Sequence, residues 1–458
     1  MTIVEAKKLL AEKKLSPQEL LNECKVNFDN RESTLNAFIT PLFDDPARGN
    51  DNSEGGSLSG IPIAIKDNIA VKDIRLTCAS KILGNYKSLF ESTVTTNLRN
   101  NGAVLVGKTN LDEFAMGFTG EFSSFGATKN PVDESLVPGG SSSGSAAAVG
   151  SGMALGALGS DTGGSVRQPA AFCGLVGVRP TYGTVSRYGL VAFSSSLDVI
   201  GPIAKRVDDA KLILESIRGC DSNDSTSVAW EPLPTKNLDE ISIGIPEELS
   251  ELAIDSDVLK RLNETKAILE KVGVKFVSVS QPSLKHSIST YFLIAPSECS
   301  ANLSRFDGVR YGLQVEDEDL KTQYTKTRTE GFGAEVRRRI LIGTYALSEG
   351  FYDDYYIQAC RMRAKISHEI YDSLKVCDAL LTPTTPSTAF KFGSKTDILD
   401  LYACDMLTIP QTLAGIPAIS VPAGVDGESR PIGMQLSGKA FSEDLLFDLA
   451  SAIEREMN

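Results

Sequence analysis

The sequence predicts an α/β fold in which strands and helices form layers. Short apolar runs alternate with helical patterns along most of the chain, and this alternation is typical of layered α/β folds. The clearest case is a β-α-β unit, with strands at 241–245 and 274–279 around an amphipathic helix at 255–272. The length of 458 residues allows about three domains, although large α/β units often run longer as one.

Two short helices are expected to open the chain. The patterns Thr2-x-x-Glu5 and Ser16-Pro17-x-Glu19 have the spacing of capping boxes, and proline suits the first position of a helix.

A polar, Gly-rich segment at 44–60 predicts an exposed loop, and the apolar run at 61–65 predicts a buried strand. Lys66 follows this strand directly. A buried strand that ends in lysine can place an ammonium in a dry pocket, but such a lysine can also mark where the strand reaches water. From this segment alone the second interpretation is favoured.

The remaining elements follow from the same patterns. Helices are predicted at 92–101, 145–149, 207–217, 334–346, 352–376 and 442–457, and strands at 103–106, 154–158, 379–381, 418–421 and 432–436. Residues 218–240 are linker-like, contain the only tryptophan and are the best candidate for a subdomain boundary. The polar segment 316–333, with its acidic run, predicts a mobile loop.

Composition excludes several classes of function. The net charge of -13 argues against this chain alone binding a nucleic-acid backbone through broad electrostatics. The eight scattered cysteines indicate neither a zinc site nor a disulfide framework, so we expect a reducing compartment. No secretory signal, transit peptide or membrane span is recognisable in the sequence.

The chain has two histidines, His286 and His368, and neither is near the Gly-Ser region in sequence. A Ser-His-Asp triad or a His-based metal site would need histidine beside the reacting atoms. Both residues are therefore predicted to be structural or exposed to solvent.

Residues 139–165 form an unusual segment of glycine, serine and small apolar residues, with Asp161 as the only formal charge. Glycine allows unusual backbone dihedrals and close approach, and serine supplies small hydroxyls. Such a segment suits a site built from main chain and hydroxyl groups.

Without histidine, a nucleophilic serine needs a carboxylate or a neutral, buried lysine as its base. Lys66 fits this role, and a second hydroxyl can relay the proton. Residues 161–165 would supply successive N–H groups to an oxyanion. In isolation, Gly163-Gly164-Ser165 is explained slightly better as a tight turn, and a phosphate cradle is a third interpretation, although no Walker motif is present.

Two groups of charged residues stay outside this chemistry. Asp112 and Glu113 could be an acid/base couple, but adjacent carboxylates are more often solvated or structural. Arg337, Arg338 and Arg339 usually mark a solvated helix face. Consecutive helical residues point about 100° apart, so at most two of the three could reach one cleft.

Three motifs carry a resemblance to a known family: residues 60–67 (GIPIAIKD), 138–145 (PGGSSSGS) and 159–167 (GSDTGGSVR). In order and spacing they resemble the signature of the amidase signature family. The resemblance implies an α/β fold with a large mixed sheet between layers of helices. It also implies a triad of Ser165 as nucleophile, Ser141 as relay held by a cis peptide bond and Lys66 as base. The implied oxyanion hole is the main chain of Thr162, Gly163 and Gly164.

Further blocks at 112–117, 128–131, 167–174, 179–198, 304–312 and 331–340 are similar to the A subunits of glutamyl-tRNA(Gln) amidotransferases. This resemblance implies a glutaminase that passes ammonia to a partner, the B subunit, which is a kinase and transamidase, beside a small third subunit. The partner would hold most of the tRNA, and ATP and Mg²⁺ are expected there, with no cofactor in this chain and no membrane contact.

The same match implies residues for the glutamine pocket. Arg338 would hold the α-carboxylate, with Arg339 as a rival, Asp405 the α-amino group, and Tyr291 is a weaker candidate. A guanidinium and a carboxylate suit the anion and the cation of an amino acid. The alternatives are a solvated helix face for the arginines and a helix or turn carboxylate for Asp405.

The resemblance also suggests a division of the single domain over residues 1–458. It has N-terminal helices at 1–30, a catalytic core at about 58–218, a linker-like part at 219–240 and a substrate-pocket half at 241–458.

The sequence departs from the family pattern in three places. The segment before Gly60 is shorter, Ser143 replaces a usual glycine, and the sequence of residues 117–131 is altered. These departures favour the mitochondrial matrix over a bacterial cytoplasm. A free-standing amidase for another amide and a non-catalytic scaffold subunit are the alternative functions.

Overall fold

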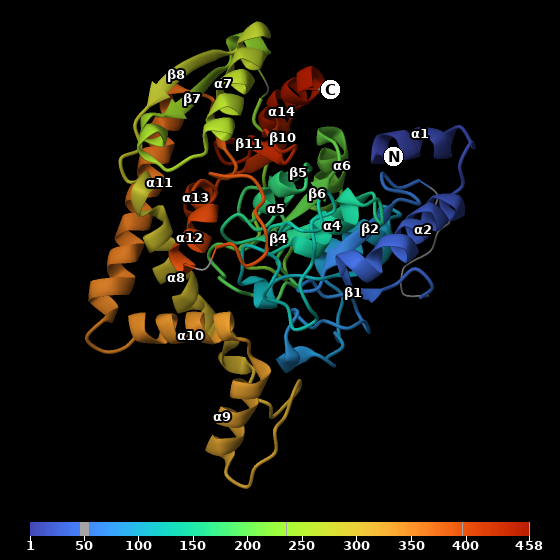
Figure 1. The fold of residues 1–458 in the computed structure, drawn as a ribbon, viewed down its shortest axis with the longest axis vertical. Helices are drawn as coiled ribbons and strands as arrows, with labels where there is room; N and C mark the ends of the chain where they lie inside the picture. The colour runs from blue at the N-terminus through green and yellow to red at the C-terminus, as the bar shows by residue number, and fades with distance from the viewer. Residues whose placement is uncertain (46–54, 235, 396, 458) are drawn as a thin grey trace.

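The computed structural model describes residues 1–45, 55–234, 236–395 and 397–457. Within these residues eleven strands form one mixed sheet in the order β1-β3-β2-β4-β6-β5-β10-β11-β9-β7-β8 (Figure 1). The strands are β1 (Phe38–Pro41), β2 (Pro62–Lys66), β3 (Val104–Thr109), β4 (Gly156–Asp161), β5 (Val176–Arg179), β6 (Val199–Ala204), β7 (Ser242–Pro246), β8 (Lys275–Val279), β9 (Ala379–Pro383), β10 (Ala418–Val425) and β11 (Pro431–Gly438). The predicted α/β class with a large mixed sheet is confirmed.

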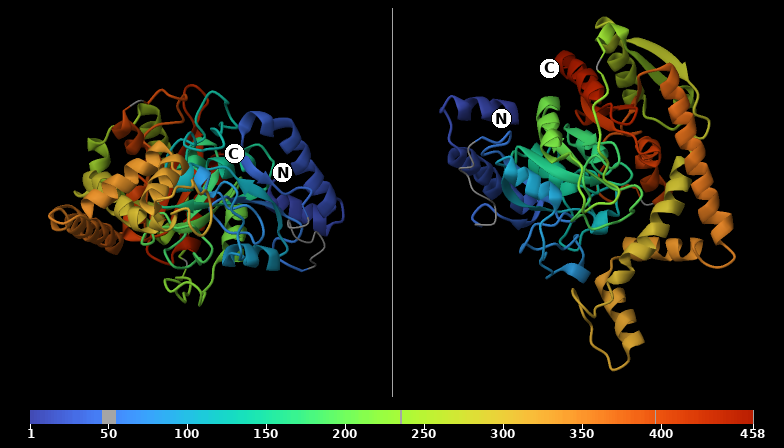
Figure 2. Two further views of the ribbon diagram at one scale, coloured as in Figure 1. Left: turned by 90° about the horizontal axis from the view of Figure 1, so that it is seen from below. Right: turned by 180° about the vertical axis from the view of Figure 1, so that it is seen from behind.

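Helices cover both faces of this sheet. They are α1 (Ile3–Ala11), α2 (Pro17–Leu35), α3 (Thr93–Asn100), α4 (Ser143–Gly150), α5 (Arg167–Phe172), α6 (Val207–Ile217), α7 (Ser256–Lys271), α8 (Ser287–Asn302), α9 (Leu320–Gly331), α10 (Ala334–Ala346), α11 (Gln358–Val376), α12 (Ile398–Tyr402), α13 (Ile409–Ala414) and α14 (Glu443–Met457). Figure 2 shows α9 projecting from one end of the molecule, away from the sheet.

The sheet joins the two halves of the sequence. Strands from the first 204 residues occupy one side, and strands after residue 241 occupy the other. They meet where β5 pairs with β10 in antiparallel register, with Arg179 opposite Ala418. The division of the chain at 219–240 stays a prediction.

Strand β2 shows how the sheet positions a functional side chain. Successive strand residues point to opposite faces. Ile63 and Ile65 lie in the core that also contains residues of α6 and α14, whereas Ala64 lies in the core that contains residues of α4. Lys66 has the parity of Ala64, so its side chain points to the α4 face.

Most predicted elements are confirmed. Both N-terminal helices begin with complete capping boxes. The β-α-β unit is present, with β7 and β8 parallel in one sheet around α7. Residues 46–54 of the exposed loop predicted at 44–60 lie outside the described residues. The described end of this segment is partly buried, because Leu58 and Gly60 are buried.

The predicted mobile loop at 316–333 is wrong, because most of it forms α9. Asp319 accepts a hydrogen bond from Thr322 N at the start of this helix, and Lys326 pairs with Asp317 at 2.5 Å. Gly331 lies against Ile82, where a Cβ on the glycine would come within 2.5 Å of a side-chain atom. A cap and a packed end thus outweigh the polar composition of the segment.

No helix in the described part of the chain is long and apolar enough to cross a membrane.

Candidate active site

Lys66 ends β2 and is fully buried. Its Nζ lies 2.7 Å from Ser141 Oγ, 2.9 Å from Ser142 Oγ and 3.0 Å from Ser160 Oγ. Asn68 also donates to Ser160 Oγ, at 2.9 Å. The interpretation that Lys66 marks where the strand reaches water is therefore wrong, because α4 and the Gly-Ser segment cover the end of β2.

Burial lowers the pKa of Lys66 to about 7, although Asp112, Asp161 and Asp198 act in the opposite direction. A dry site disfavours the charged ammonium. A substantial fraction of Lys66 is therefore neutral near pH 7 and able to accept a proton from the hydroxyl next to it.

The two ends of the Gly-Ser segment lie side by side. The peptide bond between Gly140 and Ser141 is cis, as the family resemblance implied. Ser142 N donates to Ser165 O at 3.1 Å, and Ser165 is only 4% exposed. This contact brings Ser165 next to the group formed by Ser141, Ser142 and Lys66.

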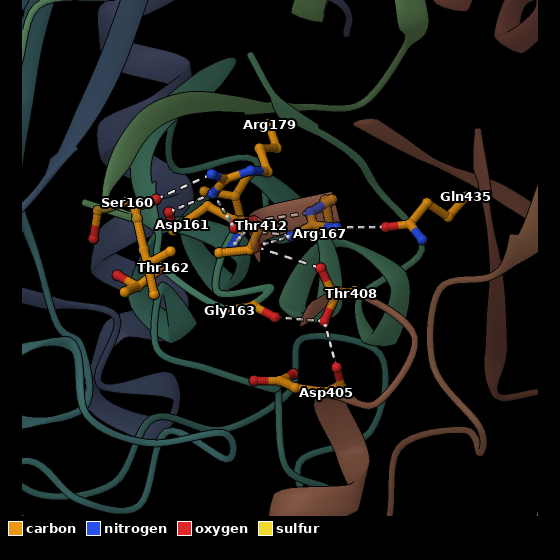
Figure 3. Close-up of polar contacts among 12 residues, drawn as sticks. Ser160, Asp161, Thr162, Gly163, Arg167, Arg179, Asp405, Thr408, Thr412 and Gln435 are labelled. Atoms are coloured by element: carbon orange, nitrogen blue, oxygen red, sulfur yellow. Dashed lines mark hydrogen bonds and ion pairs between the residues drawn. The ribbon is translucent and has the colours of Figure 1, made fainter. Parts of the chain in front are cut away.

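The carbonyl groups around the 161–165 turn are held from outside it. Arg179 Nη1 donates to Asp161 O at 2.8 Å, and Thr408 Oγ1 donates to Gly163 O at 2.6 Å (Figure 3). Gln168 N donates to Gly164 O at 2.8 Å. The N–H groups of Gly163 and Gly164 donate to no other residue in the described ranges. Such unused, consecutive N–H groups can bind an anion.

Glycine is required at position 164. Its φ is +142°, and a Cβ there would lie 2.2 Å from Thr408 Oγ1. The tight turn predicted for Gly163-Gly164-Ser165 therefore depends on glycine at this position, and the same turn contains the two unused N–H groups.

A buried ionic cluster holds the start of the turn. Asp161, Arg167 and Arg179 are fully buried. The Asp161 carboxylate accepts two hydrogen bonds from Arg167, at 2.9 and 3.0 Å, and one from Arg179 at 3.0 Å. Burial alone would raise the pKa of Asp161, but the two arginines outweigh it and hold that pKa far below its usual range. Arg167 also donates to Gln435 Oε1 at 2.6 Å, which ties the turn to β11.

Of the three consecutive arginines on α10, only Arg339 points inward. The Arg338 side chain is 48% exposed and pairs with Glu335, whereas the Arg339 side chain is 1% exposed and contacts Glu335 at 2.8 Å. The Arg339 guanidinium lies within 6 Å of the ring centres of Phe118, Phe193, Phe292 and Tyr402. Arg339 Nη2 is buried without a hydrogen-bond partner among the described residues.

Asp405 and Tyr291 lie against the turn. Asp405 is 1% exposed, its Oδ1 has no hydrogen-bond partner in the ranges that the structure describes, and a Cβ on Gly164 would lie 3.2 Å from that atom. Burial raises the pKa of Asp405 well above its usual value. A Cβ on Gly163 would lie 3.0 Å from the Tyr291 hydroxyl, and burial raises the pKa of Tyr291 as well.

Asp112 and Glu113 are buried and structural. Asp112 accepts hydrogen bonds from Gly120 N at 3.1 Å and Phe122 N at 3.0 Å. Glu113 accepts one from Gly333 N at 2.8 Å, at the start of α10. Neither carboxylate is solvated, because main-chain N–H groups donate hydrogen bonds to it in place of water. The histidines lie outside the site: His286 is exposed, and the His368 side chain is 74% exposed.

Sequence reasoning missed three polar residues of this site: Ser142, Ser160 and Thr408. Ser142 and Ser160 lie inside motifs that were recognised, but their proximity to Lys66 depends on how β2, β4 and α4 pack. Thr408 lies 243 positions beyond Ser165 (408 minus 165), and no spacing pattern connects it with the turn.

Comparison with known proteins identifies the family of this chain. The family model described as Amidase matches residues 19–447. The chain belongs to the amidase family. The protein is 48% identical over 464 residues to the A subunit of the glutamyl-tRNA(Gln) amidotransferase of Halothermothrix orenii, with coverage of 100% of this chain and 97% of that protein. The corresponding subunit of Thermotoga maritima is 52% identical over 404 residues, with coverage of 87% and 85%.

Solved structures show the same fold. This amidase superimposes on the crystal structure of that Thermotoga maritima amidotransferase subunit with a TM-score of 0.85, at 45% identity, covering 99% of this chain and 94% of that one. The peptide amidase of Stenotrophomonas maltophilia gives a TM-score of 0.84 at 26% identity, covering 100% and 97%. The family resemblance seen in the sequence is confirmed.

Proposed function

We propose that this amidase is the glutamine-hydrolysing A subunit of a glutamyl-tRNA(Gln) amidotransferase. One observation carries the choice of substrate: the buried Arg339 guanidinium and the buried Asp405 carboxylate each have an atom without a partner among the described residues. Both groups lie close enough to Tyr291, beside Gly163, to act on its pKa in opposite directions. Free buried polar atoms of opposite charge suit a ligand that carries both charges. An α-amino acid has this character, and its side-chain amide would reach the serine and the turn.

The carboxylate role proposed from the sequence for Arg338 is assigned to Arg339. Arg338 is half exposed and points away from the buried site, whereas Arg339 lies inside the aromatic cluster. Asp405 would bind the α-amino group, because a substrate ammonium favours the ionised form of a carboxyl whose pKa is raised by burial. Tyr291 would close the pocket beside Gly163.

The proposed reaction uses two serines and one lysine. Ser165 Oγ attacks the amide carbon of glutamine while its proton passes to Ser141 and from Ser141 to neutral Lys66. The carbonyl oxygen becomes an oxyanion that the main chain of Thr162, Gly163 and Gly164 stabilises. Return of the proton to the leaving nitrogen releases ammonia and leaves an acyl-enzyme. Water then attacks this ester, and glutamate leaves.

The ammonia is assigned to a partner, the B subunit, which converts Glu-tRNA(Gln) into Gln-tRNA(Gln), with a small third subunit in the complex. We assign the tRNA, ATP and Mg²⁺ to the partner. The relatives named above are bacterial, and their origin supports the bacterial cytoplasm over the mitochondrial matrix.

The test uses the complete complex and the Ser165→Ala variant. We expect this variant to lose glutamine-dependent amidation of Glu-tRNA(Gln) while amidation with free ammonium chloride continues at the wild-type rate. Glutamine-dependent amidation that survives the substitution would refute the catalytic role. A panel of aliphatic and aryl amides tests the alternative of a free-standing amidase, and faster hydrolysis of those amides than of glutamine would favour it.

A further inference from the structure

Thr408 is fully buried and comes immediately before α13. We infer that Thr408 is a positioning residue, whose hydroxyl fixes the direction of the Gly164 N–H in the oxyanion site. The inference rests on the proposed function, because it assigns a task to a residue that the proposed reaction does not name.

The geometry follows from the planarity of the peptide bond. Thr408 Oγ1 donates to Gly163 O at 2.6 Å. The bond between Gly163 and Gly164 is trans, and in a trans peptide the C=O and the N–H point in opposite directions. By holding the Gly163 carbonyl on the α13 side, Thr408 therefore directs the Gly164 N–H to the opposite side of the turn.

This restraint matters because the Gly163–Gly164 peptide has few others. Neither residue has a side chain, and Gly164 has a φ of +142°, so the backbone itself does not select one orientation. Arg179 holds the Asp161 carbonyl and Gln168 N holds the Gly164 carbonyl, and Thr408 supplies the bond for the Gly163 carbonyl between them. The packing is close as well, because a Cβ on Gly164 would come within 2.2 Å of Thr408 Oγ1.

Thr408 also has a contact that suggests a competing role. Its N and its Oγ1 each lie 3.1 Å from Asp405 O, so the hydroxyl could serve only to support the site proposed for the substrate amino group. The two roles affect different kinetic constants. Loss of oxyanion binding lowers kcat, whereas loss of substrate binding raises KM.

The experiment compares Thr408→Val and Thr408→Ser in the complete complex. Valine keeps the shape and removes the donor, and serine keeps the donor. For Thr408→Val we expect glutaminase kcat to fall about 10- to 100-fold, less than the 10²- to 10³-fold loss caused by deleting an oxyanion donor, with KM for glutamine changed less than about threefold. Thr408→Ser should restore kcat to within about threefold of wild type.

The matched control is Thr265→Val on α7. Thr265 is also fully buried, and its hydroxyl donates to the main-chain carbonyl of Arg261 at 2.8 Å. This variant should keep wild-type kcat and KM. Amidation with free ammonium chloride should be unchanged in all three variants, and co-purification of each variant with its partner subunits shows that the chain folds and assembles.

The inference is overturned if Thr408→Val keeps wild-type kcat, or if it raises KM while kcat is unchanged. It is also overturned if Thr408→Ser is as slow as Thr408→Val. In each of these cases wild-type glutamine hydrolysis, and with it the proposed function, would stand. A wild-type complex that hydrolyses no glutamine would refute the proposed function itself.

Discussion

Acidification is expected to switch off glutamine hydrolysis through Lys66. The lysine accepts a proton only in its neutral form, and burial lowers its pKa to about 7. As the pH falls through this pKa, the amine becomes protonated in the folded enzyme and the base is lost. Activity is therefore retained above about pH 7 and lost below it.

The size of the effect follows from the same pKa. With a pKa of about 7, half of Lys66 is neutral at pH 7, roughly a tenth at pH 6 and roughly a hundredth at pH 5. The value of kcat/KM should thus fall about fivefold from pH 7 to pH 6 and about tenfold more from pH 6 to pH 5. A lysine with the ordinary pKa of about 10.4 would instead give a tenfold rise for each pH unit from 6 to 9.

The assay measures ammonia release from glutamine between pH 5 and pH 8 at several temperatures. Temperature separates Lys66 from Asp112 and Asp198, whose pKa values burial raises to about 6. Deprotonation of an ammonium is strongly endothermic and that of a carboxyl is nearly athermal. The acid limb should therefore move to lower pH on warming, and Lys66→Ala should abolish hydrolysis. A limb that stays fixed on warming, or a profile flat from pH 6 to pH 8, would refute the assignment.

Two further predictions concern buried charges. Arg339→Met should raise the KM for glutamine roughly 10- to 100-fold, because a hydrogen bond to a charged group contributes about 1.5–3 kcal/mol. Arg338→Met should change this KM less than about threefold. If steady-state kinetics gave the larger KM for Arg338→Met, the carboxylate-binding role would return to Arg338. Asp161→Asn should lower the free energy of unfolding by about 3–5 kcal/mol, because it leaves two buried guanidinium groups without their carboxylate. Denaturant unfolding measures this loss, with Asp372→Asn, whose half-exposed carboxylate pairs with Lys375 at the surface, as control, and equal stabilities would contradict the reasoning.

The sequence was sufficient to predict the strand that carries Lys66, but not whether the lysine is buried or reaches water. Five apolar residues before a lysine predict a strand with a charged end, and β2 is that strand. Whether the end reaches water depends on what packs over it. Here α4 and the Gly-Ser segment do so, and these contacts join residues 75 or more positions apart. Residue chemistry made Lys66 one candidate base beside the carboxylates, and the family motifs, which imply the tertiary arrangement, selected it among them.

The arginines on α10 illustrate a different limit. The 100° step between helical residues predicts that few of the three can share one environment, and the structure agrees. Which one points inward depends on the side of α10 that faces the aromatic residues of α8 and α12. Phe292 and Tyr402 stack at 3.7 Å between ring centres and lie beside Arg339. Propensity and periodicity are the same for all three arginines, so local sequence could not choose between Arg338 and Arg339.

The buried cluster around Asp161 connects the Gly-Ser segment beside Lys66 with the half of the chain that carries Arg339. Burying one carboxylate with two guanidinium groups has a high desolvation cost, and apolar residues of similar volume are often at least as stable. The cluster nevertheless lies where the two halves of the sheet meet, and Arg167 reaches Gln435 on β11 and Thr412 on α13. Because Asp161 is the first residue of the turn, these directional bonds hold the Gly-Ser segment against the half of the chain that carries Arg339, Asp405 and Thr408. An apolar core would fill this space without fixing the relative position of the nucleophile and the substrate pocket, so the cluster is better explained by geometry than by stability.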